Sequence, residues 1–335
     1  MKKVYLYTAL ISVFITALVC WWLVVEINKD LDSPINLNTA RTFTVKPGAS
    51  LKKISHQLAA RGWLSHPWYL ILEGRRLGLA SRIKAGEYEL NPGISPRGIL
   101  SLIVSGKVIQ YSLTIPEGWT FLQIMQAVQK NEVLEHTLAQ ADEDYVMAQL
   151  DHKGEMAEGR FFPDTYHFPR GTTDVEFLKR AYDTMVRVME EEWEVRDGGL
   201  PYKSSYEALI MASIIEKETS IPDERYKIAG VFVRRLQQGM MLQTDPTVIY
   251  AIGRNFDGDI RNRDLTIDSP FNTYTSEGLP PTPIAAPGRA SINAALHPED
   301  GTALYFVAMG DGHHHFSDTL AEHNKAVAKY QLNGK

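Results

Sequence analysis

The longest apolar segment of the chain lies at its N-terminus. Residues 4–25 are uncharged and mostly apolar, and a helix of that length extends about 33 Å, enough to span the hydrocarbon core of a bilayer. Two lysines precede the segment and acidic residues follow it, which favours a cytoplasmic N-terminus and an exported remainder. We therefore predict a cytoplasmic tail at residues 1–3, a single transmembrane helix at 4–25 and a polar linker at 26–40.

Two other interpretations of this segment are less favourable. A cleaved signal peptide would have a shorter apolar core and small residues at its cleavage site, whereas this segment ends in Trp, Leu and Val. Cys20 could accept a lipid, but the preceding Val19 is too large for that signal. A single-pass anchor in the cytoplasmic membrane remains the preferred interpretation.

A strand–turn–helix pattern occurs three times after the linker. Each copy has a short strand of alternating polarity, a turn glycine, and a hydroxyl residue that can cap the next helix. The copies begin at Phe43, Tyr88 and Leu113, with glycines Gly48, Gly93 and Gly118 and caps Ser50, Ser95 and Thr120. The unit resembles the start of LysM modules, which bind chitin or peptidoglycan, although a structural β–α subdomain without a ligand explains it equally well. We predict a LysM-like subdomain at 41–107 and a second β–α connecting region at 108–150.

Longer amphipathic and apolar helices characterise the rest of the chain, and we predict a larger mixed α/β catalytic domain at 151–335. The whole exported part is therefore of the α+β class. Helices are predicted at Thr173–Val195, Tyr206–Lys217, Pro222–Gln238, Ala290–Leu296 and Asp318–Tyr330, and a strand at 303–310. Ser220 and Asp223 form a capping-box pattern. Residues 240–287 show little periodicity, and a long ordered loop of this kind is typical of the wall of a cleft.

Composition argues against nucleic-acid binding and against disulfide bonds in the exported part. The net charge is −5 and no long basic run occurs, so nucleic acid is an unfavourable partner. Cys20 is the single cysteine and lies in the predicted anchor. The exported part therefore has no disulfide and must be stabilised by its core.

Two glutamates end the apolar helix in the sequence "ASIIEKETS". On a helical wheel Glu218 lies on the side of Met211 and Ile215, whereas Glu216 lies almost opposite. The two carboxylates therefore cannot share one site. A carboxyl held against apolar side chains has a raised pKa, as a general acid at neutral pH requires. We predict that Glu218 is the acid, and that Glu216 is structural and holds a backbone amide or a nearby arginine.

Three long motifs resemble those of the YceG-like endolytic murein transglycosylases (the MltG family). They are "MASIIEKET…ER…VFVRRL…GMMLQTDPTVIYAIG", "FNTYTSEGLPPTPIAAPG" and "HPEDGTALYFVAMGDGHHHFSDTLAEHNKAV". The resemblance covers the exported chain and the anchor, and the family's catalytic glutamate falls on Glu218. It implies an enzyme of the inner membrane, with its catalytic domain in the periplasm, that cuts nascent peptidoglycan glycan strands near their site of synthesis and so terminates their polymerisation. Peptidoglycan synthases are the protein partners that this location implies.

Lytic transglycosylation needs one carboxyl group. The acid protonates the oxygen between MurNAc and GlcNAc, and the 6-hydroxyl of MurNAc then closes a 1,6-anhydro ring as the same carboxylate takes its proton. The remaining needs are polar groups that orient the glycan. On the resemblance, the substrate-binding candidates are Gln243, Asp245, Tyr250, Asn272 and Tyr274; alternatively, Asp245 caps a helix and the others pack in the core.

A metal or another cofactor is not expected. His313, His314 and His315 are consecutive, so their side chains would point to opposite sides of a strand instead of converging on an ion. One of them, or His323, could contact the glycan instead.

Two other functions are also compatible with the sequence. A muramidase would use Glu218 as the acid and Asp245 to activate water or to form a covalent intermediate, and its products would have ordinary reducing ends. A membrane-tethered wall-binding protein would rely on the repeated β–α units, would not cleave glycan, and would be indifferent to the loss of Glu218.

Overall fold

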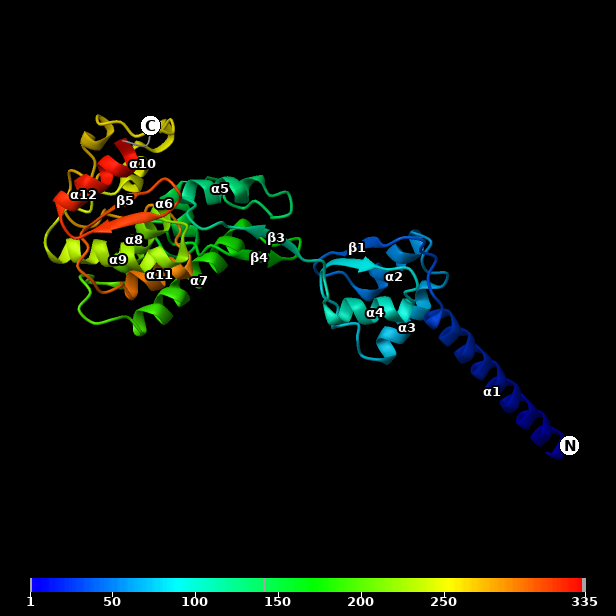
Figure 1. Cartoon of the computed structure of the whole chain (residues 1–335). Coiled ribbons are helices and arrows are strands. Elements are labelled where there is room, and N and C mark those ends of the chain that lie inside the picture. The colour runs from blue at the N-terminus through cyan, green and yellow to red at the C-terminus, as the bar shows by residue number, and fades with distance from the viewer. Residues whose placement is uncertain (1, 141, 333–335) are drawn as a thin grey trace. The chain divides into compact units, whose positions relative to one another are not determined.

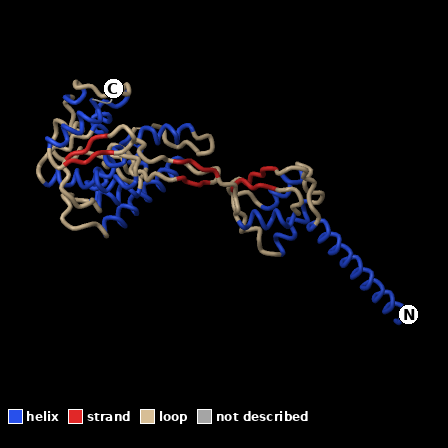
Figure 2. Tube along the Cα trace, in the orientation of Figure 1, coloured by secondary structure: helices blue, strands red, loops and turns tan. Residues whose placement is uncertain are grey.

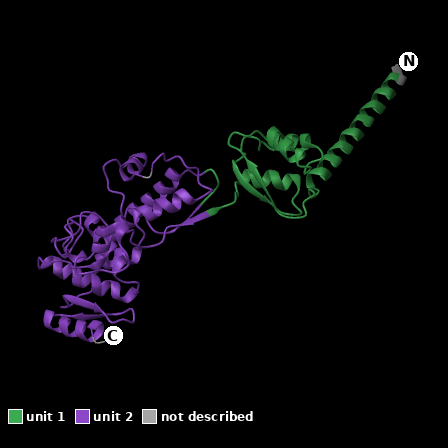
Figure 3. Ribbon diagram, turned by 90° about the horizontal axis from the view of Figure 1, so that it is seen from above, with its two compact units in different colours: residues 1–111, 168–171 green, residues 112–167, 172–335 purple. Residues whose placement is uncertain are grey.

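The computed structural model describes residues 2–140 and 142–332 and contains both helices and strands (Figure 1). It divides into two compact units: unit 1 holds residues 1–111 and 168–171, and unit 2 holds 112–167 and 172–335 (Figure 3). The described strands form three separate two-stranded sheets, which Figure 2 shows in red. The boundaries predicted from the sequence are 107/108 and 150/151; in the division into two units, residues 112–150 belong to the same unit as the helices that follow them.

Unit 1 is built on one antiparallel strand pair with helices packed against it. Its elements are α1 (Lys2–Asp32), β1 (Arg41–Val45), α2 (Leu51–Ala60), α3 (Pro67–Arg76), β2 (Gly86–Leu90) and α4 (Pro96–Ser105). Phe43 of β1 lies opposite Tyr88 of β2, and both side chains are fully buried. Apolar residues of α2, α3 and α4 complete this core. Every second residue of each strand points toward it, which accounts for the alternating polarity of the strands in the sequence.

The three predicted strand–turn–helix copies are present as β1–α2, β2–α4 and β3 (Tyr111–Thr114) followed by α5 (Phe121–Lys130). The turn glycines all have positive φ, which a residue without Cβ adopts readily. The hydroxyl groups of Ser50, Ser95 and Thr120 each accept a hydrogen bond from the third backbone N–H of the helix. Helix α3, between the first and second copies, was not predicted.

The predicted linker at 26–40 is wrong in its first part, because α1 continues to Asp32. Leu31 is buried in the core of unit 1. The guanidinium of Arg97, at the start of α4, donates to Asp32 Oδ1, to Asn28 Oδ1 (2.8 Å) and to Glu73 Oε1 of α3 (3.0 Å). These contacts join the C-terminal end of α1 to the two helices that support it.

Unit 2 is mainly helical. Its further elements are α6 (Glu143–Gln149), β4 (Thr165–Phe168), α7 (Asp174–Glu194), α8 (Ser205–Glu218), α9 (Pro222–Gln237), α10 (Asp245–Ile252), α11 (Arg289–Leu296), β5 (Tyr305–Ala308), β6 (His314–Ser317) and α12 (Leu320–Val327). Short 3₁₀ turns lie at Gly253–Asn255 and Asp264–Thr266, and a π-helical turn at Ala328–Leu332. Strand β3 pairs with β4, and β5 pairs antiparallel with β6. The core surrounds α8, which packs against α7, α9, α10 and α11.

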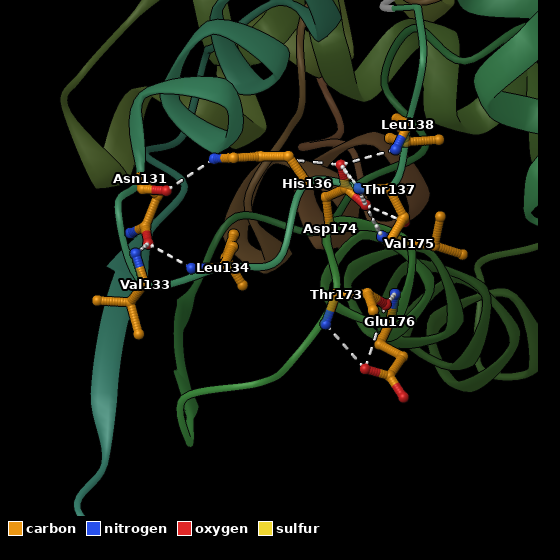
Figure 4. Close-up of polar contacts among 10 residues, drawn as sticks. All are labelled: Asn131, Val133, Leu134, His136, Thr137, Leu138, Thr173, Asp174, Val175 and Glu176. Carbon is orange, nitrogen blue, oxygen red and sulfur yellow. Dashed lines mark hydrogen bonds and ion pairs between the residues drawn. The ribbon is translucent and has the colours of Figure 1, made fainter.

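The start of α7 is fixed by hydrogen bonds that are drawn in Figure 4. Thr173 and Glu176 form a capping box. The carboxylate of Asp174, which is buried, accepts hydrogen bonds from the backbone N–H groups of Thr137 and Leu138, both at 3.1 Å. The segment that contains Thr137 and Leu138 is thereby tied to the start of α7, and the buried carboxylate of Asp174 has hydrogen-bond donors.

Three local predictions in unit 2 are wrong. Ser220 does not cap α9: the cap position is Ile221, no side chain caps it, and Pro222 begins the helix. Residues 240–287 are not entirely loop, because α10 lies within them. Asp245 is the first residue of α10 and not its cap. Pro246 in the first turn of the helix has no N–H to leave unsatisfied, which explains why a sequence that reads as a turn begins a helix.

We predict that Arg97→Ala loosens the end of α1. The substitution removes the contacts to Asn28 and Asp32, and the loss of such partly exposed charged hydrogen bonds costs about 1–2 kcal/mol. That cost corresponds to a roughly tenfold larger population of the opened state, which limited trypsin digestion of the full chain in lipid nanodiscs measures as faster cleavage after Lys29.

Arg76→Ala is the matched control. Arg76 binds the same carboxylate, Glu73, at 2.9 Å but has no contact with α1 among those described. Its loss should leave cleavage after Lys29 unchanged. Equal effects of the two substitutions would mean that Arg97 does not hold α1.

Candidate active site

Helix α8 carries the candidate acid at its last residue. Residues 208–215 are buried without interruption, so the helix is packed on every side. After Glu218 the chain leaves the helix at Thr219, which has extended backbone angles. Glu218 therefore marks the point where the buried helix meets a cleft.

The carboxyl group of Glu218 is partly buried and has a single described hydrogen-bond donor. Thr244 Oγ1 donates to Glu218 Oε1. Burial raises the pKa of Glu218 to about 7, and the negative charge of Asp245 adds to this, whereas the bond from Thr244 opposes it. The raised pKa predicted from the helical wheel is confirmed, and its main cause is the predicted one.

Glu216 has a different role on the other side of α8. Its Oε2 accepts hydrogen bonds from the backbone N–H of Gly288 at 3.0 Å and from Ser291 Oγ at 2.7 Å. Gly288 is the cap position of α11 and has no side chain to cap it. Glu216 thus supplies an anionic cap to another helix, and the predicted structural role at a backbone amide is confirmed.

The loop before α10 brings polar groups to Glu218. Leu242 and Thr244 are buried, whereas Gln243 and Asp245 are exposed. The loop is held by Thr273: its carbonyl accepts from Gln243 N–H and its hydroxyl accepts from Thr244 N–H, both at 3.1 Å. Gln243 has a φ of 52°, a left-handed conformation that is uncommon for residues with a Cβ.

A buried arginine lies behind this loop. Arg235 Nη1 donates to the carbonyls of Met241 (3.0 Å) and Leu242 (2.9 Å) and to Gln243 Oε1 (3.3 Å). Burial lowers the pKa of Arg235 from its ordinary value, but an arginine stays charged. It therefore supplies a fixed positive charge and orients the side chain of Gln243.

Asp245 is engaged by a tyrosine from the following loop. Tyr274 OH donates to Asp245 Oδ1 at 2.6 Å. Burial, together with this hydrogen bond, raises the pKa of Tyr274, so the phenol stays protonated and remains a donor. Tyr274 thus holds one oxygen of the Asp245 carboxylate, directly after Thr244 in the chain.

These groups line a cleft of about 410 Å³ in unit 2. We call it the Glu218 cleft. Its far wall comes from β5, β6 and α12, where the rings of Tyr305 and His323 stack with centroids 5.3 Å apart. The lining residues are Glu218, Arg235, Leu242, Gln243, Asp245, Tyr274, Tyr305, Phe306, Val307, Ala308, His314, Leu320, His323, Val327 and Gln331.

Two of the predicted substrate-binding residues lie elsewhere. Asn272 is fully buried, and its carboxamide donates to the carbonyls of Leu265 and Ile267 and accepts from Tyr274 N–H. Tyr250 donates to Glu158 at 3.1 Å and is absent from the lining of the Glu218 cleft. Both residues shape the loops behind the cleft, because each uses its polar group on a protein partner.

The consecutive histidines bind a carboxylate. His313 Nδ1 and His314 Nδ1 lie 3.1 and 2.8 Å from the oxygens of the buried Glu224. Burial opposes ionisation of this carboxyl, but the hydrogen bonds from both histidines hold the pKa of Glu224 below its ordinary value. Within the part of the chain that the structure describes, no three His, Cys, Asp or Glu side chains are placed to hold a metal ion.

Three features of the cleft were not predicted from the sequence: the hydroxyl group of Thr244 that donates to Glu218, the guanidinium of Arg235 and the ring of Tyr305. A charged residue within the apolar run of α9 was the available signal for Arg235. No sequence signal indicated the Tyr305–His323 pair, because it forms only when α12 packs against β5.

A carboxyl group with a raised pKa, a hydroxyl that donates to it and a polar cleft together are typical of a general acid–base site. Residues 43–329 match the YceG-like family. The chain is 33% identical over 323 residues to the endolytic murein transglycosylase of Bacillus subtilis, covering 91% of this chain and 87% of that protein. It is 28% identical to the endolytic murein transglycosylase of Streptococcus pneumoniae, covering 90% of this chain and 61% of that protein.

A solved structure is also similar. The crystal structure of a YceG-like protein from Listeria monocytogenes matches with a TM-score of 0.53 and 31% sequence identity, covering 86% of this chain and 99% of that one. The chain belongs to the YceG-like family.

We predict that Glu218→Gln stabilises the protein at alkaline pH. The ordinary pKa of 4.5 is raised to about 7 in the folded state, so the folded protein binds more protons than the unfolded chain between these values and loses stability as pH rises through them. The glutamine has no such loss. From pH 5 to pH 8 its advantage over the wild type should grow by about 1–3 kcal/mol, as thermal unfolding at the two pH values measures.

Glu216→Gln is the control for this experiment. It weakens the cap of α11 and should lower the unfolding temperature at both pH values. An identical pH dependence in the wild type and in Glu218→Gln would contradict the desolvation of Glu218.

A second prediction concerns Thr244. Thr244→Val keeps the shape of the side chain and removes the donor that stabilises ionised Glu218, so the pKa of Glu218 should rise further above about 7. The carboxyl resonances of ¹³C-glutamate-labelled protein report this, with Glu218→Gln for assignment. Thr275→Val, which removes a hydroxyl that bonds Asn272 O, should leave the titration unchanged.

Proposed function

We propose that the protein is an endolytic lytic transglycosylase, which cleaves the MurNAc–GlcNAc bond of peptidoglycan and leaves 1,6-anhydro-MurNAc ends. The observation that carries the proposal is the raised pKa of Glu218 in a cleft, with Glu216 occupied on the other side of the helix. The relatives from Bacillus subtilis and Streptococcus pneumoniae bear the name of this activity.

The chemistry follows from one carboxyl group. Protonated Glu218 gives its proton to the glycosidic oxygen as the bond from that oxygen to C1 of MurNAc breaks, and GlcNAc leaves with its 4-hydroxyl group. The 6-hydroxyl of MurNAc then bonds to C1 and returns a proton to Glu218. No water is consumed, and the site is restored. A pKa of about 7 suits both steps, because each protonation state is populated near neutral pH.

The other polar groups of the cleft have separate tasks in this proposal. Gln243, positioned by Arg235, and the exposed oxygen of Asp245 bind sugar hydroxyl and amide groups. Tyr274 holds Asp245 in place, and the ring of Tyr305 offers an apolar face to a sugar ring. Asn272 and Tyr250 act through the loops that they support.

The setting of the enzyme is also part of the proposal. Helix α1 is long and apolar enough to span a membrane, and we assign its N-terminus to the cytoplasm and the rest of unit 1, together with unit 2, to the periplasm. Unit 1 is the LysM-like part in this assignment. Anchored in this way, the enzyme would act on strands as peptidoglycan synthases extend them, and each cut would end a strand.

A muramidase is the second candidate, and Asp245 is the observation that favours it. Its carboxylate lies in the same cleft as Glu218 and could activate water or form a covalent bond to the sugar. Its hydrogen bond with Tyr274 weighs against this, because one oxygen of the carboxylate is already held by the protein.

The products distinguish the two reactions. Purified glycan strands digested by the full chain in detergent, in heavy-oxygen water, should yield anhydro ends that lack the label and are lighter by one water than hydrolysed ends. Label in the new ends, found by mass spectrometry, would establish hydrolysis and refute the transglycosylase mechanism.

Matched variants test the assignment of the acid. Glu218→Gln should lower cleavage by about 10²–10⁴-fold, the usual contribution of a general acid, while the protein remains folded. Asp245→Asn should keep most of the activity if Glu218 acts alone. Loss of activity in Asp245→Asn with an active Glu218→Gln would reverse the roles.

A further inference from the structure

Helix α3 presents an apolar and basic stripe that no other part of unit 1 covers. Four exposed residues form the stripe: Trp68, Leu72, Arg75 and Arg76. Trp68, Leu72 and Arg76 follow one another at spacings of four residues, and Arg75 is three residues from Leu72, so the four lie on one side of the helix. Trp68 is 50% exposed and Leu72 48%. The other face buries Tyr69, Leu70, Glu73 and Gly74. An exposed Trp and an exposed Leu one turn apart on the same helix point to a binding surface.

The stripe lies at the level where α1 leaves the membrane. His66, the cap position of α3, has its Nδ1 3.7 Å from Asp30 Oδ1 of α1. Asp30 is five residues beyond the apolar run that ends at Val25, which corresponds to about 7.5 Å along the helix. The headgroup layer on each side of a bilayer is about 5–7 Å thick. The start of α3 is therefore beside this layer.

The attachment of α3 to α1 is firm. Arg97 donates to Glu73 of α3 and to Asn28 and Asp32 of α1 at the same time. The Trp68 ring rests edge-on against Tyr69, with centroids 4.1 Å apart. The stripe cannot turn away from the membrane surface without breaking these contacts.

We propose that α3 is an interfacial helix that lies on the outer face of the membrane spanned by α1. Trp68 and Leu72 insert among the headgroups, and Arg75 and Arg76 bind the phosphates of anionic lipids. This inference rests on the proposed anchoring by α1. Trp is favoured at this depth, and exposed Trp and Leu together with basic residues are typical of helices that lie on a membrane surface.

The chemistry of the stripe fits phosphate better than sugar. Arg75 and Arg76 supply donors and no acceptor, whereas sugar hydroxyl groups require both. Arg76 remains 63% exposed beside Glu73, so its guanidinium can reach a second anion. Phosphate oxygens only accept hydrogen bonds, and Arg binds them in a bidentate manner.

Fluorescence of the full chain in nanodiscs that contain phosphatidylglycerol tests the proposal. In a Cys20→Ala background, Leu72→Cys carries an environment-sensitive dye. We expect blue-shifted emission that lipids with a nitroxide near the headgroup quench. Lys107→Cys, exposed in the same unit, should behave as in water. Val13→Cys in α1 should report the bilayer interior.

The control positions separate the possible failures. A water-like dye at position 72 with an inserted Val13→Cys label would overturn the interfacial helix and leave the anchor intact. A water-like label at position 13 would overturn the anchor and this proposal with it. A response at position 72 only after addition of glycan strands would make the stripe a glycan site and refute lipid binding.

Charge reversal tests the role of the arginines. Arg75→Glu combined with Arg76→Glu should abolish most of the quenching at position 72, whereas Lys52→Glu combined with Lys53→Glu, at an exposed basic pair on α2, should leave it unchanged. Equal effects of the two pairs would exclude a specific role for α3. Cleavage of soluble glycan should be the same in all these variants, since Glu218 lies in unit 2, so this test is independent of the proposed catalytic mechanism.

Discussion

Helix α8 must be buried on all sides, and the arrangement of unit 2 follows from that constraint. Its apolar circumference is covered by α7, α9, α10 and α11. At its C-terminal end two glutamates leave in different directions. One of them caps α11 through Gly288 and Ser291. The other is left at a cleft, where desolvation supplies its raised pKa. Packing and catalytic potential therefore have a common origin.

The different environments of the two glutamates could be predicted from the sequence, because they depend only on the period of a helix and on the apolar residues around it. The three capped helices after turn glycines could also be predicted, since caps act within one turn of chain. Length and composition were sufficient to identify the helix of the anchor. Each of these features is local, or repeats with the period of its own element.

The remaining features depend on contacts between distant segments. Thr244 reaches Glu218 because Thr273 holds its loop, and no pattern within "QTDP" contains that information. Asn272 reads as an exposed polar residue but satisfies the backbone of its own loop. The polar residues after Val25 read as a linker, yet Arg97 pairs with two of them and keeps them helical. In each of these cases a polar side chain has a hydrogen-bond partner that the local sequence pattern does not reveal.

The continuity of α1 with unit 1 has a mechanical consequence. A transmembrane helix tilts when its apolar length exceeds the local thickness of the bilayer. A flexible linker would absorb such a tilt, but the helix enters unit 1 without a break, with Leu31 in the core. The rest of unit 1 must therefore lean with α1. In a bilayer, hydrophobic mismatch between α1 and the surrounding lipid would set the angle between the rest of unit 1 and the membrane plane.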